Sequence, residues 1–334
     1  MTAGSHRIGG STSTGPAVEI LEIGAAVRAL SVPDVQGTIR NVVLGNQDQA
    51  AYERGAEYFG AVVGRFANRI AGGNFILAET TYTIPANDGD NALHGGPDGF
   101  HRRPWTVTNL SSSSITLELT SPAGDQGFPG ELRTTVTYTV EGNDVRIDYN
   151  ATTDASTVIN LTNHSHFNLD GEDTGTIDHH LLQLNAARFT PVDPRLIPTG
   201  ELRLVDDSVF DFCDGALIGP RIRTPDPQML LSRGLDHNFV VNGHGLRRHA
   251  TLRSTRSGIH LEVLSDQPGV QVYTGNFFDG SVVGTNGGTY RQGAGIALET
   301  QNFPDAPNQP TFPSAVLEPD STYRTTTIWR FSTS

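Results

Sequence analysis

The sequence of 334 residues contains no lysine, and its 23 basic residues are all arginine. Without lysine the chain can form no Schiff base on a side-chain amine and has no Walker lysine for a nucleotide phosphate. Acidic residues number 36, so the formal net charge is −13. Because nucleic acids are bound by basic faces, this balance argues against them as partners. The short basic runs 101–103 and 247–249 are interpreted as solvated loop charges.

Cysteine is nearly absent, since Cys213 is the only one. A single cysteine excludes an intramolecular disulfide and a cysteine-rich zinc site, and we expect Cys213 to be a small buried hydrophobe. No apolar run approaches the ~18–20 residues of a membrane span. Residues 1–15 lack the apolar segment of a signal peptide. We therefore expect a cytoplasmic protein without a membrane partner, with a flexible N-terminal tail over 1–15 and a single domain over 16–334.

Charged residues are also scarce, at 18%, whereas 37 glycines and 19 prolines supply many turns. This many breakers exclude a coiled coil or a helical array. Segments 134–140 and 145–149 alternate apolar and polar residues around a Gly-Asn turn, which predicts a β-hairpin. Further strands are expected at 17–23, 115–119, 259–264, 270–273, 295–298 and 325–331. The Ala-rich segment 46–70 contains three glycines, which favours short strands with a turn or one helical turn.

These patterns together predict one large all-β domain with largely antiparallel sheets and without long helices. Segment 160–171 is the first candidate for chemistry. As a strand it would carry alternate polar side chains on one face, which should then line water or a wet cleft. Those residues are Asn160, Thr162, His164, His166 and Asn168. Two histidines two residues apart match half of a metal site, but no other segment supplies a second pair, so no metal is assigned.

Glu299 directly follows the apolar segment 295–298. A carboxyl at the end of a buried strand is partly desolvated, which raises its pKa toward the range of a general base. The alternative is that Glu299 simply emerges at the surface of the sheet.

Four further segments carry polar residues that could bind a ligand. Asn68 and Arg69 could bind hydroxyls or a carboxylate, although such arginines are often surface charges. His94 precedes two glycines, where the backbone can approach a ligand closely. Asp236 could clamp sugar hydroxyls or cap a turn, and Gln267 lies in a turn-like stretch.

Together these segments resemble the aldose 1-epimerases, also called galactose mutarotases. The matching stretches follow the family's order from about residue 17 to 331. They are 58–71 (YFGAVVGRFANRIA), 93–96 (LHGG), 127–132, 160–169, 198–201, 235–239, 266–271, 273–276, 298–310 and 326–331. The resemblance implies a single β-sandwich with an open sugar cleft. It also implies an enzyme that interconverts the α and β anomers of free aldoses such as galactose or glucose, without metal or cofactor.

The resemblance also implies roles for individual residues. Glu299 would remove the proton of the C1 hydroxyl, and His164 would protonate the ring oxygen. The sugar would be bound or oriented by Asn68, Arg69, His94, Asp236 and Gln267. His166 stands where the family usually has an aromatic residue, commonly tyrosine, so a binding role carried over to His166 would lack the phenol.

Two other sugar-related functions stay open at this point, and a metal enzyme centred on His164 and His166 ranks after both. One is a sugar-binding or regulatory homologue without catalysis, although such a protein need not retain both Glu299 and His164. The other is a carbohydrate lyase or hydrolase, which would need a second carboxylate, with Asp236 as the candidate. In each case the partner is a small sugar, and we expect a monomer or a homodimer.

Overall fold

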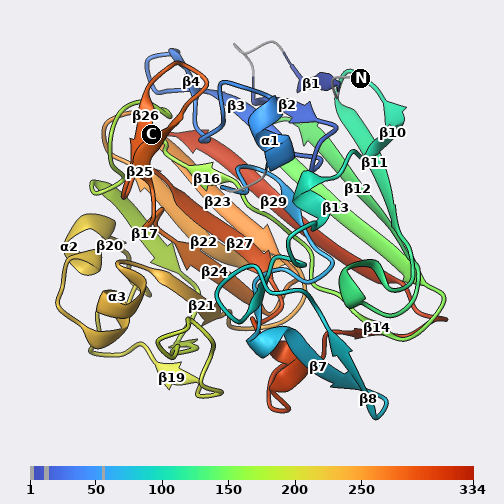
Figure 1. Ribbon diagram of the computed structural model, residues 1–334. Coiled ribbons are helices and arrows are strands. Elements are labelled where there is room, and N and C mark those ends of the chain that lie inside the picture. Colours follow the sequence, from blue (N-terminus) through green and yellow to red (C-terminus); the bar gives the residue numbers. More distant parts are fainter. Residues whose placement is uncertain (1–3, 11–14, 55–56) are drawn as a thin grey trace.

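The fold is described from a computed structural model, which covers residues 4–10, 15–54 and 57–334 (Figure 1). The expected all-β class is confirmed, because strands dominate and the helices are short. The α-helices are α1 (Ala50–Arg54), α2 (Ile218–Ile222) and α3 (Pro227–Ser232), and the 3₁₀ helices are η1 (Ala71–Gly73), η2 (Phe100–Arg102), η3 (Asp125–Gly127) and η4 (Ala306–Asn308). None of the helices in the described ranges is long and apolar enough to cross a membrane.

A nine-stranded sheet has the order β10-β11-β12-β13-β29-β23-β22-β17-β20. Its strands are β10 (Thr106–Leu110), β11 (Ser114–Ser121), β12 (Leu132–Glu141), β13 (Asp144–Thr153), β17 (His180–Leu184), β20 (Ala216–Leu217), β22 (Arg247–Ser254), β23 (Ile259–Ser265) and β29 (Tyr323–Thr333). A six-stranded sheet has the order β16-β27-β24-β21-β18-β19. Its strands are β16 (His166–Phe167), β18 (Arg188–Phe189), β19 (Arg203–Leu204), β21 (Asp236–Val240), β24 (Gly269–Tyr273) and β27 (Ile296–Gln301).

The remaining strands form a four-stranded sheet and several two-stranded pairs. The four-stranded sheet contains β1 (Ser5–Gly9), β2 (Ala17–Leu21), β3 (Val27–Pro33) and β4 (Ile39–Asn41). The pairs are made by β5 (Val62–Val63) with β15 (Thr162–Asn163), β6 (Arg69–Ile70) with β9 (Ala92–Leu93), β7 (Asn74–Leu77) with β8 (Thr80–Thr83), β14 (Thr157–Val158) with β28 (Val316–Leu317), and β25 (Asp279–Val283) with β26 (Thr289–Arg291).

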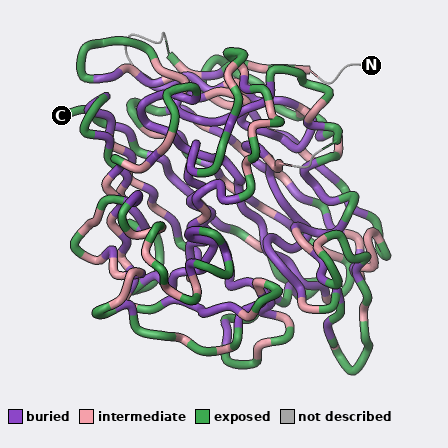
Figure 2. The backbone as a smooth tube through the Cα atoms, turned by 60° about the vertical axis from the view of Figure 1, so that its left-hand side comes forward, coloured by how far each residue is buried: buried purple, intermediate pink, exposed green. Residues whose placement is uncertain are grey.

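The two large sheets share one apolar core. Val272 and Leu298 of the six-stranded sheet belong to the same buried cluster as Leu261 of the nine-stranded sheet. The sheets also meet through an aromatic pair, since the ring of Phe167 packs edge-on against Trp329 with 5.1 Å between centroids. In Figure 2 the strands that cross the molecule are buried, whereas exposed backbone lies in the peripheral loops. This arrangement is the expected antiparallel sandwich.

The expected strands are present with small shifts at their ends. The predicted hairpin is β12 and β13, paired from Leu132↔Thr153 to Glu141↔Asp144 around the loop 142–143. Segment 46–70 contains α1, β5 and β6, as expected for short elements, although residues 55–56 lie outside the described part. Cys213 is only partly buried, and its thiol lies 3.4 Å from the carbonyl of Ala186.

Three expectations are corrected by the structure. Residues Ser5–Gly9 of the expected tail form β1, which pairs with β2 and places Ile8 in the core, while 1–3 and 11–14 lie outside the described residues. The basic runs are not fully solvated, because the imidazoles of His101 and His249 are buried. Segment 160–171 is not one strand: β15 pairs with β5, and β16 pairs with β27, so alternate side chains do not share an open face.

Candidate active site

Three neighbouring strands of the six-stranded sheet carry the acidic and amide groups of the site. On β27, Ile296 and Leu298 point into the core, so the period of two turns Glu299 to the opposite face. On β24, Val270 and Val272 do the same and turn Gln271 outward beside Glu299, its register partner. Asp236 is the first residue of β21, next to β24. A sheet face therefore presents polar groups from three strands.

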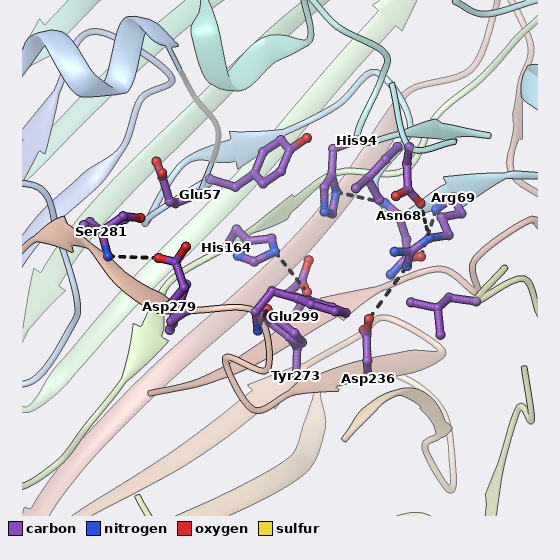
Figure 3. Close-up of a pocket in the computed structure, with 17 residues that line it drawn as sticks. Glu57, Asn68, Arg69, His94, His164, Asp236, Tyr273, Asp279, Ser281 and Glu299 are labelled. Atoms are coloured by element: carbon purple, nitrogen blue, oxygen red, sulfur yellow. Dashed lines mark hydrogen bonds and ion pairs between the residues drawn. The ribbon is translucent and has the colours of Figure 1, made fainter. Parts of the chain in front are cut away.

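His164 comes from the link between β15 and β16 and faces Glu299 (Figure 3). Its Nε2 atom lies 3.5 Å from Oε1 of Glu299, and both side chains are almost fully buried. The other carboxylate oxygen of Glu299 and Nδ1 of His164 have no hydrogen-bond partner among the described residues. Both groups therefore have hydrogen-bonding capacity left for a ligand.

Burial shifts the two members of this pair in opposite directions. Desolvation lowers the pKa of His164 to about 4. Desolvation raises the pKa of Glu299 well above its usual value, and the neighbouring carboxylate of Asp236 adds to the rise, while Arg69 opposes it. Both shifts disfavour charge on the isolated groups. The pair is therefore set to exchange one proton between a carboxyl and an imidazole.

Arg69 lies in the small ladder of β6 and β9, and Asn68 and His94 flank that ladder. Arg69 pairs with Leu93 in register, and His94 follows directly at a φ of 51°. The backbone N–H of Asn68 donates to Nδ1 of His94 over 3.1 Å. Because burial also keeps this imidazole neutral by lowering its pKa, its remaining proton is on Nε2. His94 is thus a hydrogen-bond donor.

This tautomer also bears on metal binding. His94, His164 and Glu299 bring possible ligand atoms within 4.8 Å of one another, a set different from the His164–His166 pair considered from the sequence. Binding a metal through Nε2 of His94 would displace its proton, and binding through Nδ1 would break the bond from Asn68. The cluster therefore fits a hydrogen-bonded ligand better than a metal ion.

Arg69 is held by two carboxylates. Its Nε donates to Asp88 over 2.7 Å, and its Nη1 lies 3.8 Å from Asp236. Asp236 also accepts a 2.6 Å bond from the side-chain amide of Gln271. Burial raises the pKa of Asp236, while Arg69 and Gln271 oppose the rise. The guanidinium and the carboxylate of Asp236 are therefore fixed in place before any ligand arrives.

A cavity of about 430 Å³ is lined by most of the site residues that were predicted from the sequence. Its lining includes Asn68, Arg69, His94, His164, Asp236 and Glu299. The lining also contains residues that sequence reasoning missed, among them Glu57, Tyr58, Asp88, Tyr273, Phe277 and Asp279. The alternation of apolar and polar residues along 270–273 could have indicated Tyr273 and Gln271, because their side chains lie on the face of the strand opposite to that of the valines. Asp88 and Tyr58 lie on irregular backbone, where no sequence pattern placed them.

Gln267 is not brought to this cavity. It precedes β24 and lines a separate groove with Tyr323, to whose hydroxyl its amide donates over 2.8 Å. Gln267 lies in the bend that precedes β24, whereas Gln271 is the middle residue of that strand. The expected sugar-binding position is thus corrected: within the matching stretch 266–271, Gln271 is the residue beside Glu299.

His166 does not line the cavity either. Its side chain is fully buried behind His164, 4.9 Å away between ring centroids, and packs against Phe59, Tyr273 and Phe278. Burial lowers its pKa well below the usual value. A direct binding role for His166 is therefore not supported by its position.

Nearly the whole chain is similar to proteins of known family. The family model for aldose 1-epimerase matches residues 11–330. A galactose mutarotase of Bos taurus is 43% identical over 316 residues, covering 94% of this chain and 91% of that protein. An aldose 1-epimerase of Escherichia coli strain K12 is 35% identical and covers 96% of this chain and 93% of that protein.

Solved structures agree in fold. An aldose epimerase homologue from C. elegans superposes with a TM-score of 0.92 at 32% identity, covering 99% of both chains. A galactose 1-epimerase from Lactobacillus acidophilus gives a TM-score of 0.86 at 28% identity, covering 99% of this chain and 95% of that one. The family match, the shared fold and the buried Glu–His pair at a polar cavity lead to one assignment. The chain belongs to the aldose 1-epimerase family.

Proposed function

We propose that the protein interconverts the α and β anomers of free aldoses such as galactose or glucose, with Glu299 and His164 as its acid–base pair. One observation carries this proposal above the others: the two buried groups lie 3.5 Å apart in the wall of a 430 Å³ cavity. Mutarotase activity is the shared function of the aldose 1-epimerase family, and relatives named galactose mutarotase support galactose as a substrate.

The reaction needs two coordinated proton transfers. To open the ring, the C1 hydroxyl loses its proton, and the O–H electron pair becomes the second bond of the aldehyde. The bond between C1 and the ring oxygen breaks, and the ring oxygen takes up a proton. Rotation about C1–C2 and closure on the other face of the aldehyde give the opposite anomer. Nothing is oxidised or consumed, so a base and an acid suffice.

In the opening direction Glu299 accepts the proton of the C1 hydroxyl and His164 donates one to the ring oxygen. Desolvation opposes a carboxylate or an imidazolium that stands alone. The charged forms therefore arise together, when the one proton of the pair moves from the Glu299 carboxyl to the His164 imidazole, and each charge stabilises the other. In the alternative arrangement of the same proton, Glu299 is the acid and His164 the base. Closure of the ring uses the pair with the roles exchanged, as a reversible reaction requires. Each such proton transfer contributes ~10²–10⁴-fold.

The remaining polar groups are suited to hold the sugar hydroxyls. Asn68 uses its amide oxygen on the N–H of Arg69, which leaves its amide N–H groups as donors. His94 donates through Nε2, and Asp236 accepts. Because these side chains are fixed by one another, binding a neutral sugar orders few new rotamers. The site is thereby complementary to a ring carrying both donors and acceptors.

Polarimetry on freshly dissolved α-galactose and α-glucose tests the proposal. We expect relaxation to the anomeric equilibrium to be accelerated in proportion to enzyme concentration. Glu299→Gln should remove most of that rate while calorimetry still detects sugar binding, and Glu141→Gln, on an exposed strand end, serves as the matched control. Relaxation no faster than buffer, with sugar still bound, would instead identify a non-catalytic sugar-binding protein.

Two finer expectations belong with this proposal. The sequence predicts a cytoplasmic enzyme that acts as a monomer or a homodimer. Light scattering on the purified protein and fractionation of the producing cells are the measurements that check them.

A further inference from the structure

Tyr58 lies against three of the buried imidazoles. Its ring centroid is 4.6 Å from that of His94, 4.5 Å from His101 and 5.7 Å from His164. The residue also lines the cavity that holds Glu299. A single aromatic ring thus contacts both a proposed proton-transfer residue and a proposed sugar donor.

The backbone around Tyr58 is bonded directly to the backbone of His164. Gly60 donates to the carbonyl of His164 over 3.0 Å, and His164 donates to the carbonyl of Ala61 over 2.9 Å. Ala61 closes the turn by donating to the carbonyl of Tyr58 over 3.1 Å. The backbone of His164 and the turn that carries Tyr58 are therefore joined by two hydrogen bonds.

This turn is also strained. Tyr58 has a φ of 57°, a left-handed conformation that is costly for an aromatic residue. Gly60 cannot be replaced, because a Cβ there would lie 1.9 Å from the carbonyl oxygen of Val27. Strain of this kind persists only where surrounding contacts hold it, and it is concentrated at functional sites.

Packing is what orients the ring of His164. Its Nδ1 has no hydrogen-bond partner among the described residues, and its Nε2 faces Glu299. By contrast, His94 is fixed by the N–H of Asn68. With no second hydrogen bond, rotation of the His164 ring is limited by the packing of its aromatic neighbours, which are Tyr58, His94, His166 and Tyr273.

We propose that Tyr58 is a positioning residue whose ring, rather than its hydroxyl, holds the imidazole of His164 in line with Glu299. This inference rests on the proposed function. Misplacing a reacting group by about 1 Å can cost ~10²-fold in rate. The role belongs to the ring because it is the ring that packs, in tilted arrangements, against the three imidazoles.

The test compares two substitutions that separate the ring from the hydroxyl. Tyr58→Phe keeps the ring, and we expect kcat for mutarotation within ~2-fold of the native enzyme. Tyr58→Asn removes the ring but suits the left-handed backbone, and we expect kcat to fall ~30- to 100-fold, with KM changed less than ~3-fold. Tyr82→Leu, which removes a ring packed on Phe75 in a separate hairpin, is the control for a generally loosened fold.

Three results overturn the inference: unchanged kcat in Tyr58→Asn, a rise confined to KM, or a loss in Tyr58→Phe of tenfold or more. The Phe variant tests the inference even where the Asn variant does not fold. Native protein without activity on any aldose would defeat the proposed function instead. In that case ¹⁵N spectra of the histidines still test Tyr58, because the His164 ring signals should shift and broaden in Tyr58→Asn but not in Tyr58→Phe.

Discussion

The side-chain amide of Gln271 donates a 2.6 Å hydrogen bond to Asp236, across two neighbouring strands of the six-stranded sheet. The same glutamine is the register partner of Glu299 on the next strand. Gln271 thereby connects the carboxylate beside Arg69 with the proposed acid–base pair. Its remaining amide oxygen is buried and has no hydrogen-bond partner among the described residues.

The first prediction follows from the positions of two glutamines in one stretch. Gln271→Ala should raise KM for galactose ~10-fold or more, because it leaves Asp236, which lines the cavity, without its amide donor. Gln267→Ala, in the separate groove beside Tyr323, should change KM less than ~3-fold. Initial-rate polarimetry of both variants checks this, and equal effects would contradict the assignment of Gln271 to the site.

The second prediction concerns the stability of Glu299→Gln. The folded-state pKa of Glu299 is raised above its unfolded value, so the folded protein binds the extra proton, and stability is lost as pH rises above about 4.5. The glutamine variant has no such proton to lose. The free energy of unfolding of Glu299→Gln, relative to that of the native enzyme, should therefore increase with pH above 4.5, although the mutarotase rate of the variant is lower. Urea unfolding at pH 5 and pH 8 measures the difference. A constant difference would show that Glu299 does not titrate differently on folding.

The third prediction concerns His166. Neither of its ring nitrogens has a hydrogen-bond partner among the described residues, although the side chain is fully buried among aromatic rings. A buried unpaired polar group costs ~1–3 kcal/mol. His166→Phe should therefore raise the free energy of unfolding by ~1 kcal/mol or more while keeping kcat within ~3-fold. Destabilisation in urea titration would mean that the imidazole makes favourable interactions that phenylalanine cannot replace.

The fourth prediction is a loss of stability in mild acid. Burial lowers the pKa of His94, His101, His164, His166, His180, His237 and His249. An unfolded imidazole takes up its proton near pH 6.5, whereas His164 in the folded protein does so near pH 4. Between these values the unfolded state binds more protons, so the free energy of unfolding should fall as pH falls.

The opposing carboxyl groups are fewer. Burial raises the pKa of Glu57, Asp236, Glu299 and Asp305, which favours the folded state on acidification. We therefore expect a net decrease in the thermal midpoint from pH 6.5 to pH 4. Differential scanning calorimetry across this range is the measurement. A midpoint that is flat or rises toward acid would contradict the expectation that the buried imidazoles outweigh the buried carboxyl groups.

The sequence predicted the strands well where side chains alternate over a long ladder, as in β12 and β13. It predicted the 160–171 segment poorly, because two-residue strands in different sheets leave no period to detect. The matching motifs in the sequence identified six residues that line the cavity, including Glu299 and His164. It selected Gln267 instead of Gln271, since both glutamines lie in one matching stretch and only the register of β24 with β27 separates them.

The sequence identifies Tyr58 only as part of stretch 58–71, which matches the family. Its position depends on a left-handed turn and on two backbone hydrogen bonds to a segment about a hundred residues away in the chain. Local pattern contains no information about such a contact.

The central claim is that Glu299 and His164 act as one proton-exchanging unit. The most direct test is the rate of α-galactose mutarotation by polarimetry for the native enzyme, Glu299→Gln, His164→Gln and the double variant. Because removing either group disables the same step, we expect the double variant to be no more than ~3-fold slower than the slower single variant. Losses that multiply in the double variant, or native-like rates in either single variant, would contradict it.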